Sequence, residues 1–181
     1  MTSPNSIQNL LDVQAYSGHP QWHPATSAFC LGERSGLTLI DPASTQRHLG
    51  RALLFLKALA QTEGTLLFVA TRGHTQGMVR HLAHQLGQPA VTGKWVGGTL
   101  TNWAQVQTTT GDLRAFPDAI FILNPAENQH AIREAQKMHL PVIAIVDSST
   151  SPEGIDYLIP GNDDSDRFVY NVLHSVAQVS S

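Results

Sequence analysis

The stretch TLLFVATRGHTQGMVRHLAHQLG, residues 65–87, holds a buried strand, a short turn and an amphipathic helix in direct succession. Residues 65–70 form an almost continuous apolar run, which is typical of a strand covered on both faces. The apolar residues that follow recur at helical spacing, and Gly87 ends the pattern. They are Met78, Val79, Leu82, Ala83 and Leu86. A strand that leads straight into such a helix favours a parallel sheet, whose crossovers carry helices.

The same alternation extends along the rest of the chain. Apolar runs predict four more strands, at residues 37–40, 119–123, 141–146 and 157–159. Helical stripes occur at residues 49–60, 131–138 and 168–176, and a short helix is expected near residues 7–13. We therefore expect an α/β fold with a parallel sheet and helices on both faces. Residues 1–35 are predicted to form an extended N-terminal arm and residues 36–181 a single α/β domain.

The composition excludes several classes of protein. The 181 residues carry a formal net charge of -3 and only 14% charged residues, which argues against a broad basic face that coats nucleic acid. No apolar run approaches the length of about 20 residues that a membrane helix needs. Cys30 is the single cysteine, so no internal disulfide can form, and a reducing compartment is expected.

The loops that follow the predicted strands are the natural places for a ligand. In a parallel sheet they gather at the carboxyl ends of the strands. The turn at residues 71–75 could hold a phosphate, although it matches neither a P-loop nor a dinucleotide fingerprint. Asn124-Pro125 and residues 147–149 could bind a metal or a sugar hydroxyl, but such residues more often cap turns.

Catalytic and metal-binding constellations are sparse elsewhere. His74, His81 and His84 lack a nearby carboxylate or thiolate, so we interpret them as solvated or RNA-facing residues and predict no metal. Asp163 and Asp164 precede the last helix, where we expect them to cap its amides rather than to act as an acid–base pair. We predict no catalytic residue and no cofactor.

The segment GKWVGGTLTNW, residues 93–103, places a glycine pair between two tryptophans. A lysine, aromatic rings, small hydroxyls and a backbone that permits close approach are what RNA contact uses. The alternative is a tight turn in which Trp95 and Trp103 belong to the core. The residues themselves leave both interpretations open.

This segment resembles the R-W-L-G-G-x-L-T-N-F signature of the ribosomal protein S2 family, from the small ribosomal subunit. Further segments are similar to that family in the same order along nearly the whole chain. They are SGHPQWHPATSAFCLGERSGLTLID, LLFVATRGHTQG and PDAIFILNPAENQHAIREAQKMHLPVIAIVDSSTSPEGIDYLIPGNDD.

The resemblance implies a flavodoxin-like sandwich, with five parallel strands between helices. It implies a structural constituent of the small subunit, not an enzyme, that docks between head and body on ribosomal RNA and neighbouring ribosomal proteins. Neither a membrane nor a small-molecule substrate is expected. Candidate RNA-binding residues are Arg34, Arg72, Lys94, Trp95, Gly97, Gly98, Thr99, Thr101 and Asn102.

The chain departs from the family pattern in two respects. Bacterial members carry a long coiled-coil insertion after the L-T-N-F segment, whereas only about a dozen residues separate Trp103 from Pro117 here. Mitochondrial members resemble this shorter form, so we expect a mitochondrial ribosome, with a bacterial cytoplasm or a plastid as alternatives. The negative net charge predicts that protein neighbours supply much of the docking surface.

One competing function is an enzyme. Residues 65–87 also resemble the first strand-turn-helix unit of a sugar-phosphate isomerase domain, in which the turn meets a phosphate. Only Thr75 offers a hydroxyl between His74 and the body of the helix, whereas a phosphate loop would use several. A sugar-phosphate isomerase-like or other phosphate-binding α/β enzyme is therefore the alternative to a ribosomal role.

Overall fold

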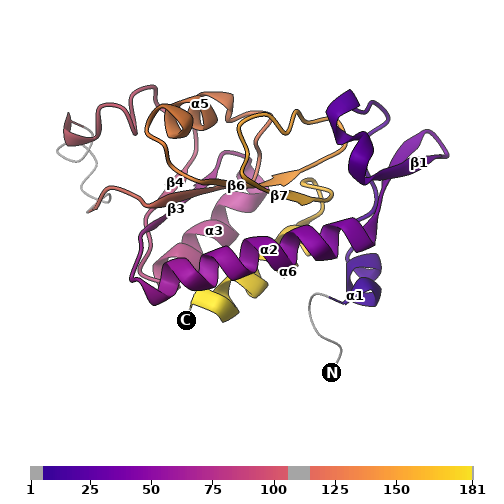
Figure 1. Cartoon of the computed structure of the whole chain (residues 1–181), viewed down its shortest axis with the longest axis horizontal. Coiled ribbons are helices and arrows are strands. Elements are labelled where there is room, and N and C mark those ends of the chain that lie inside the picture. The colour runs from indigo at the N-terminus through magenta and orange to yellow at the C-terminus, as the bar shows by residue number, and fades with distance from the viewer. Residues whose placement is uncertain (1–5, 106–114, 181) are drawn as a thin grey trace.

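The computed structural model describes residues 6–105 and 115–180. Its centre is an all-parallel sheet with the strand order β4-β3-β5-β6-β7 (Figure 1). The strands are β3 (Leu66–Ala70), β4 (Ala90–Thr92), β5 (Ala119–Ile122), β6 (Val142–Val146) and β7 (Tyr157–Pro160). The three central strands, β3, β5 and β6, are buried along their whole length.

Helices cover both faces of this sheet. α2 (Pro42–Gln61), α3 (Gly73–Gln85) and α6 (Asp166–Ser180) lie on one face, and α5 (Gln129–Lys137) lies on the other (Figure 1). Phe68 and Phe121 belong to the core under the first three helices. Leu67 and Ile132 belong to the core under α5. The predicted α/β class with a flavodoxin-like sandwich is confirmed, because alternate residues of each strand enter the two cores.

Two strand predictions need correction. Residues 37–40 do form a strand, β2 (Leu37–Ile40), but it pairs antiparallel with β1 (Cys30–Arg34) in a separate two-stranded sheet. The fifth strand of the main sheet is instead the edge strand β4, which the sequence did not indicate. Its three residues are half-buried, so the segment lacks the apolar run that marks the central strands.

The segment that precedes residue 36 packs against the domain. It contains α1 (Ile7–Asp12), a 3-10 helix η1 (Pro24–Phe29) and β1. Leu10 is buried in the core beneath α2 and α6, whereas Phe29 is buried in the core on the α5 face. The predicted arm is therefore anchored at both faces of the sheet.

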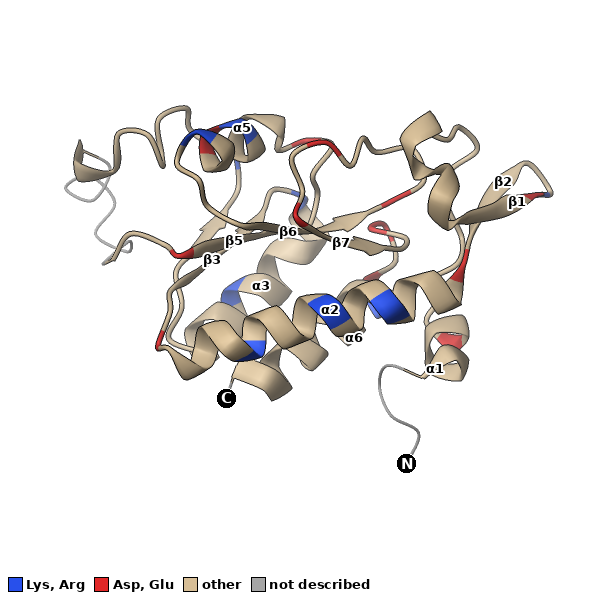
Figure 2. Cartoon of the chain, viewed as in Figure 1, with Lys and Arg blue, Asp and Glu red and all other residues tan. Residues whose placement is uncertain are grey.

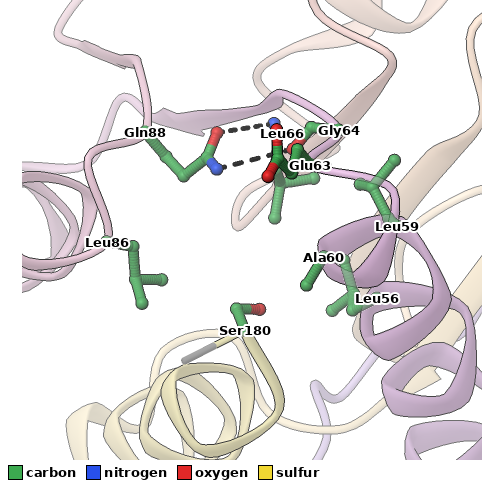
Figure 3. A pocket seen from close by; sticks show the side chains of 9 residues that line it. All are labelled: Leu56, Leu59, Ala60, Glu63, Gly64, Leu66, Leu86, Gln88 and Ser180. Atoms are coloured by element: carbon green, nitrogen blue, oxygen red, sulfur yellow. Dashed lines mark hydrogen bonds between the residues drawn. The ribbon is translucent and has the colours of Figure 1, made fainter.

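A cavity of about 190 Å³ lies at the amino-terminal edge of β3 (Figure 3). The carboxyl ends of α2, α3 and α6 surround it, and its lining mixes leucine and alanine side chains with the polar residues Glu63, Gln88 and Ser180. Gln88 crosses one side of it and accepts a hydrogen bond from the Leu66 amide at 2.8 Å. Glu63 is the one lining residue that ionises, so the cavity offers no acid–base pair. Across the described ranges, no helix has the length and apolar character that a membrane crossing requires.

Candidate functional site

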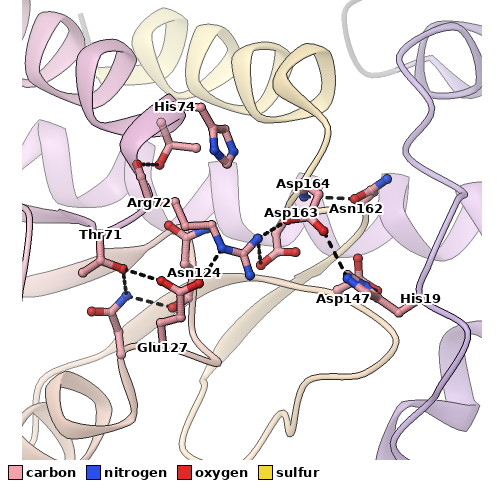
Figure 4. Close-up of polar contacts among 12 residues, drawn as sticks. His19, Thr71, Arg72, His74, Asn124, Glu127, Asp147, Asn162, Asp163 and Asp164 are labelled. Carbon is pink, nitrogen blue, oxygen red and sulfur yellow. Dashed lines mark hydrogen bonds and ion pairs between the residues drawn. The ribbon is translucent and has the colours of Figure 1, made fainter.

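Polar side chains converge at the carboxyl ends of the strands (Figure 4). Thr71 and Arg72 follow β3, Asn124 follows β5, Asp147 follows β6, and Asp163 follows β7. Because the chain places β4 on one side of β3 and β5 on the other, the switch point of this sheet lies between β3 and β5. Ligands of doubly wound folds bind at such a point, so this edge is the natural candidate for a ligand site.

Arg72 lies across the switch point and is paired with carboxylates on both sides (Figure 4). Its Nε donates to Glu127 at 2.7 Å, and its Nη1 lies 3.4 Å from Asp163 and in direct contact with Asp164. Burial disfavours the charged guanidinium, but the Glu127 hydrogen bond and the aspartate charges outweigh it and raise the pKa of Arg72. The charge of Arg72 is thus balanced inside the chain.

His19 joins the N-terminal segment to the same edge. Its Nδ1 lies 3.1 Å from Asp147 and its Nε2 lies 3.1 Å from Asp164, while its backbone amide donates to Ser148 Oγ at 2.9 Å. Burial lowers the pKa of His19, but the Asp147 hydrogen bond and the surrounding carboxylates raise it overall. The adjacent Gly18 permits this approach, because a Cβ there would lie 2.5 Å from Ser148 Oγ.

The adjacent aspartates before α6 do not cap that helix, so the capping prediction is wrong. Ser165 Oγ instead accepts from the Phe168 amide at 3.3 Å. Asp164 pairs with Arg72 and His19, and Asp163 is buried beside Arg72. Burial raises the pKa of Asp163 to about 6, although Arg72 opposes the shift.

The charge at this edge is unsuited to a phosphate. Four carboxylates, those of Glu127, Asp147, Asp163 and Asp164, face one arginine and one histidine. A phosphate at the switch point would meet these carboxylates, while the only arginine in the cluster is already paired. The geometry therefore does not favour a phosphate-binding enzyme.

A second arrangement involves residues 93–103, which wrap around one buried carboxylate. Glu134 on α5 accepts from Trp95 Nε1 at 3.1 Å and from the Gly98 and Leu100 amides at 2.9 Å each. The Thr101 amide lies 3.4 Å from the same carboxylate. Burial alone would raise the pKa of Glu134, but these four donors lower it, so the carboxylate stays ionised.

The two glycines of the segment have different roles. Gly98 has a φ of +92°, a left-handed conformation that a side chain strains. This conformation turns the Gly98 amide toward Glu134. Gly97 has no positive φ, and a Cβ added to it would meet no atom within 4 Å. Close approach at this motif is therefore made by an internal carboxylate, and only Gly98 requires glycine for its backbone conformation.

The outer side of the segment is exposed next to the helix that holds it. Lys94, Gly97, Thr101 and Asn102 are exposed, whereas Trp95 and Thr99 are buried. Three basic residues of α5 are exposed: His130, Arg133 and Lys137. They are spaced three and then four residues apart, so their side chains lie along one stripe of the helix. Cationic groups and small polar groups thus share the α5 face of the molecule.

The predicted RNA-binding residues do not form one patch. Seven of the nine lie in residues 94–102, Arg72 lies at the carboxyl edge of the sheet, and Arg34 is exposed at the end of β1. Lysine and arginine are spread over several elements, including α2, α3 and α5 (Figure 2). RNA contact by these nine residues stays a prediction. Sequence reasoning missed Glu134 and His19 as structural centres. The only signal was their position within the family-like segments, because their partners are distant in sequence.

Comparisons of the sequence with known proteins identify one family. A family model for ribosomal protein S2 matches residues 10–116 and 109–180. The chain is 31% identical to small ribosomal subunit protein uS2 of Deinococcus radiodurans, over 96% of this chain and 82% of that protein. It is 30% identical to small ribosomal subunit protein uS2 of Thermus thermophilus, over 93% of this chain and 82% of that protein. The alignment with the Deinococcus protein spans 216 positions, more than the 181 residues here, so that relative has residues without a counterpart in this chain.

Proposed function

The chain belongs to the ribosomal protein S2 family and is a structural constituent of the small ribosomal subunit, where we propose that residues 93–103 and the exposed stripe of α5 meet ribosomal RNA. One observation carries this proposal. The Glu134 carboxylate accepts hydrogen bonds from backbone amides of the segment and so holds the segment against α5. The exposed Lys94, Thr101 and Asn102 are therefore presented in a fixed arrangement.

The chemistry of this surface suits an RNA backbone. Lysine and arginine neutralise phosphates, and small polar side chains bond to phosphate and sugar oxygens. Lys94 supplies one cation, and Arg133 and Lys137 supply two more from α5. No carboxylate of the described residues lies within ion-pair distance of these three cations.

The other predicted site residues have separate roles in this proposal. Trp95, Gly98 and Thr99 shape the segment from inside, because their side chains or amides are already engaged or buried. Arg34 is proposed as an outlying phosphate contact on the β1–β2 hairpin. Arg72 is proposed as a contact only where RNA approaches the carboxyl edge, since its charge is already matched.

Docking between the head and the body of the small subunit, with neighbouring ribosomal proteins, is part of the same proposal. Family membership supports it, and so does the charge. A net charge of -3 gives little long-range attraction to RNA, so protein neighbours should provide a large share of the interface. The family is structural, and we assign no catalytic residue and no cofactor.

We propose a mitochondrial ribosome as the location. The support is the short segment between Trp103 and Pro117, together with the low lysine content. Residues 106–114 of that segment lie outside the described part of the chain. The relatives named above are bacterial, which fits the alternative of a bacterial cytoplasm, and a plastid is the third possibility.

Sedimentation tests the function and the location together. The chain, carrying a small tag, is expressed in its source cells, and lysate or organelle extract is resolved on a sucrose gradient. We expect the chain to migrate with small subunits, and organelle fractionation to place those subunits in mitochondria. Migration as a free protein would refute the ribosomal role, whereas subunits found only in the cytoplasm would refute the location alone.

A further inference from the structure

The β1–β2 hairpin extends from the body of the molecule and has one free strand edge (Figure 1). The outer side of β2 is covered, because Ile40 donates to the Tyr16 carbonyl at 2.9 Å and Thr38 donates to the His19 carbonyl at 3.1 Å. β1 pairs with β2 alone among the described residues. The Cys30 amide at the start of β1 donates to the Ser27 carbonyl, but the opposite edge beyond Cys30 has no strand partner in the described part of the chain, and such an edge is the usual template for addition of another strand.

Apolar side chains and a cavity accompany this edge. Leu31 is 68% exposed and Trp22 is 53% exposed, so both remain largely open to solvent. They line a cavity of about 230 Å³ together with Cys30, Gly32 and three polar residues, Ser27, Glu33 and Thr38. A cavity of this size accommodates one large aliphatic or aromatic side chain. Exposed apolar groups that surround a cavity mark interaction sites more often than isolated ones do.

The character of the surface distinguishes between protein and RNA as its partner. The charged residues of β1 are Glu33 and Arg34, whose charges cancel, so the edge has no net attraction for phosphates. Alternating backbone N–H and C=O groups are matched by another polypeptide strand, and RNA has no such ladder. The register shift between Cys30 and Gly32 leaves only a short ladder, so a side chain in the cavity must supply much of the affinity.

We propose that the free edge of β1 docks an extended segment of a neighbouring small-subunit protein. The segment adds as a strand beside Gly32 and Glu33, and one of its apolar side chains enters the cavity beside Trp22 and Leu31. This inference rests on the proposed function in one respect, that the chain is part of the small subunit. It does not depend on the proposed RNA surface at residues 93–103. The two sites lie on different elements, so either can fail without the other.

Cross-linking in assembled subunits tests the proposal. A photoreactive phenylalanine analogue is placed at position 31 and, as a matched control, at position 54, since Leu54 is 70% exposed on α2. We expect position 31 to link to one ribosomal protein, through an extended peptide identified by mass spectrometry. We also expect the amides of residues 31–33 to exchange at least about tenfold more slowly in the subunit than in the free chain.

Leu31→Lys and Leu54→Lys form the functional comparison. Both replace an exposed leucine, so the free chain should fold in either case, which circular dichroism and urea unfolding check. We expect L31K to reduce co-sedimentation of the chain and of the cross-linked neighbour severalfold, and L54K to leave both unchanged. A cross-link from position 31 to RNA, to a second copy, or to nothing would overturn the proposal. Failure of the unmodified chain to enter subunits would instead refute the proposed function.

Discussion

The carboxylate of Glu134 accepts a hydrogen bond from the indole of Trp95 at 3.1 Å, across 39 residues of sequence. The same carboxylate accepts hydrogen bonds from the Gly98 and Leu100 amides, so one side chain of α5 satisfies several donors of the turn that follows Trp95. Trp95, Gly98 and Leu100 of this motif therefore form a receptor for an internal anion. In the proposed function, the exposed side chains around it make the contacts with RNA.

Removing the Glu134 carboxylate should release the segment. We expect Glu134→Ala to lower the free energy of unfolding by about 1–3 kcal/mol, because buried donors lose their partner. Urea unfolding measures the change, and hydrogen exchange at residues 98–101 should accelerate. Gln136→Ala, at an exposed position of the same helix, is the control. Unchanged exchange at residues 98–101 in Glu134→Ala would contradict the proposed role of Glu134.

The two glycines should respond differently to substitution. Gly98→Val forces a side chain into a left-handed conformation and should cost about 1–3 kcal/mol. Gly97→Ala meets open space and should leave the free energy of unfolding nearly unchanged. Urea unfolding of the single variants measures this difference. The double variant Gly97→Val, Gly98→Val should keep the sheet folded but fail to enter small subunits in a sedimentation assay. Normal assembly of that variant would make the segment a packing element only.

Lys94 should contribute one phosphate contact. Lys94→Gln should weaken binding to small-subunit RNA and reduce the slope of log affinity against log salt by about 0.7 to 0.9. Lys57→Gln provides a matched control, since Lys57 is also exposed but lies on α2, across the sheet. Filter binding at several salt concentrations gives both slopes. An equal reduction in the two variants would show that only net charge matters.

The carboxyl edge of the sheet should make stability depend on pH. The folded-state pKa of Asp163 is raised from 3.8 to about 6, so ionising this group costs stability as the pH rises through that window. His19 has a pKa raised above 6.5, so its stabilising charge is fully present below pH 6.5 and is lost above it. Asp163 and His19 therefore both lower stability as the pH rises, Asp163 between pH 3.8 and about 6 and His19 above pH 6.5, whereas His48, whose pKa is lowered by burial, acts in the opposite sense.

Urea unfolding at intervals of one pH unit checks this dependence. Asp163→Asn should remove the part of the decline below about pH 6, because asparagine cannot ionise. His19→Gln should remove the part above pH 6.5, because it has no charge to lose. A decline of the same size in both variants and in the unaltered chain would exclude these two groups as its source.

Much of the fold could be predicted from the apolar pattern. Residues 66–70, 119–122 and 142–146 are strands buried throughout, and such runs cannot face water on either side. The pattern could not reveal β4, whose three residues are half-buried, or the antiparallel partner of β2. In both cases the strand forms because a particular segment of the chain lies beside it. The sequence of a short strand carries little information about which segment becomes its partner.

The candidate sites were less predictable for a related reason. The family-like motif located residues 93–103, but not the ionised carboxylate at its centre. The aspartates before α6 were expected to cap the helix, yet they pair with Arg72 and His19, which lie far earlier in the chain. Electrostatic partners are chosen by distance in space, which local sequence patterns do not encode.

The amino-acid sequence by itself determined the parallel α/β architecture, because burying its apolar runs and helical stripes leaves few other arrangements. The tertiary structure alone decided what the glycine-rich segment binds. A buried carboxylate must be satisfied by donors, and only the packing of α5 beside residues 93–103 brings the four donors to Glu134.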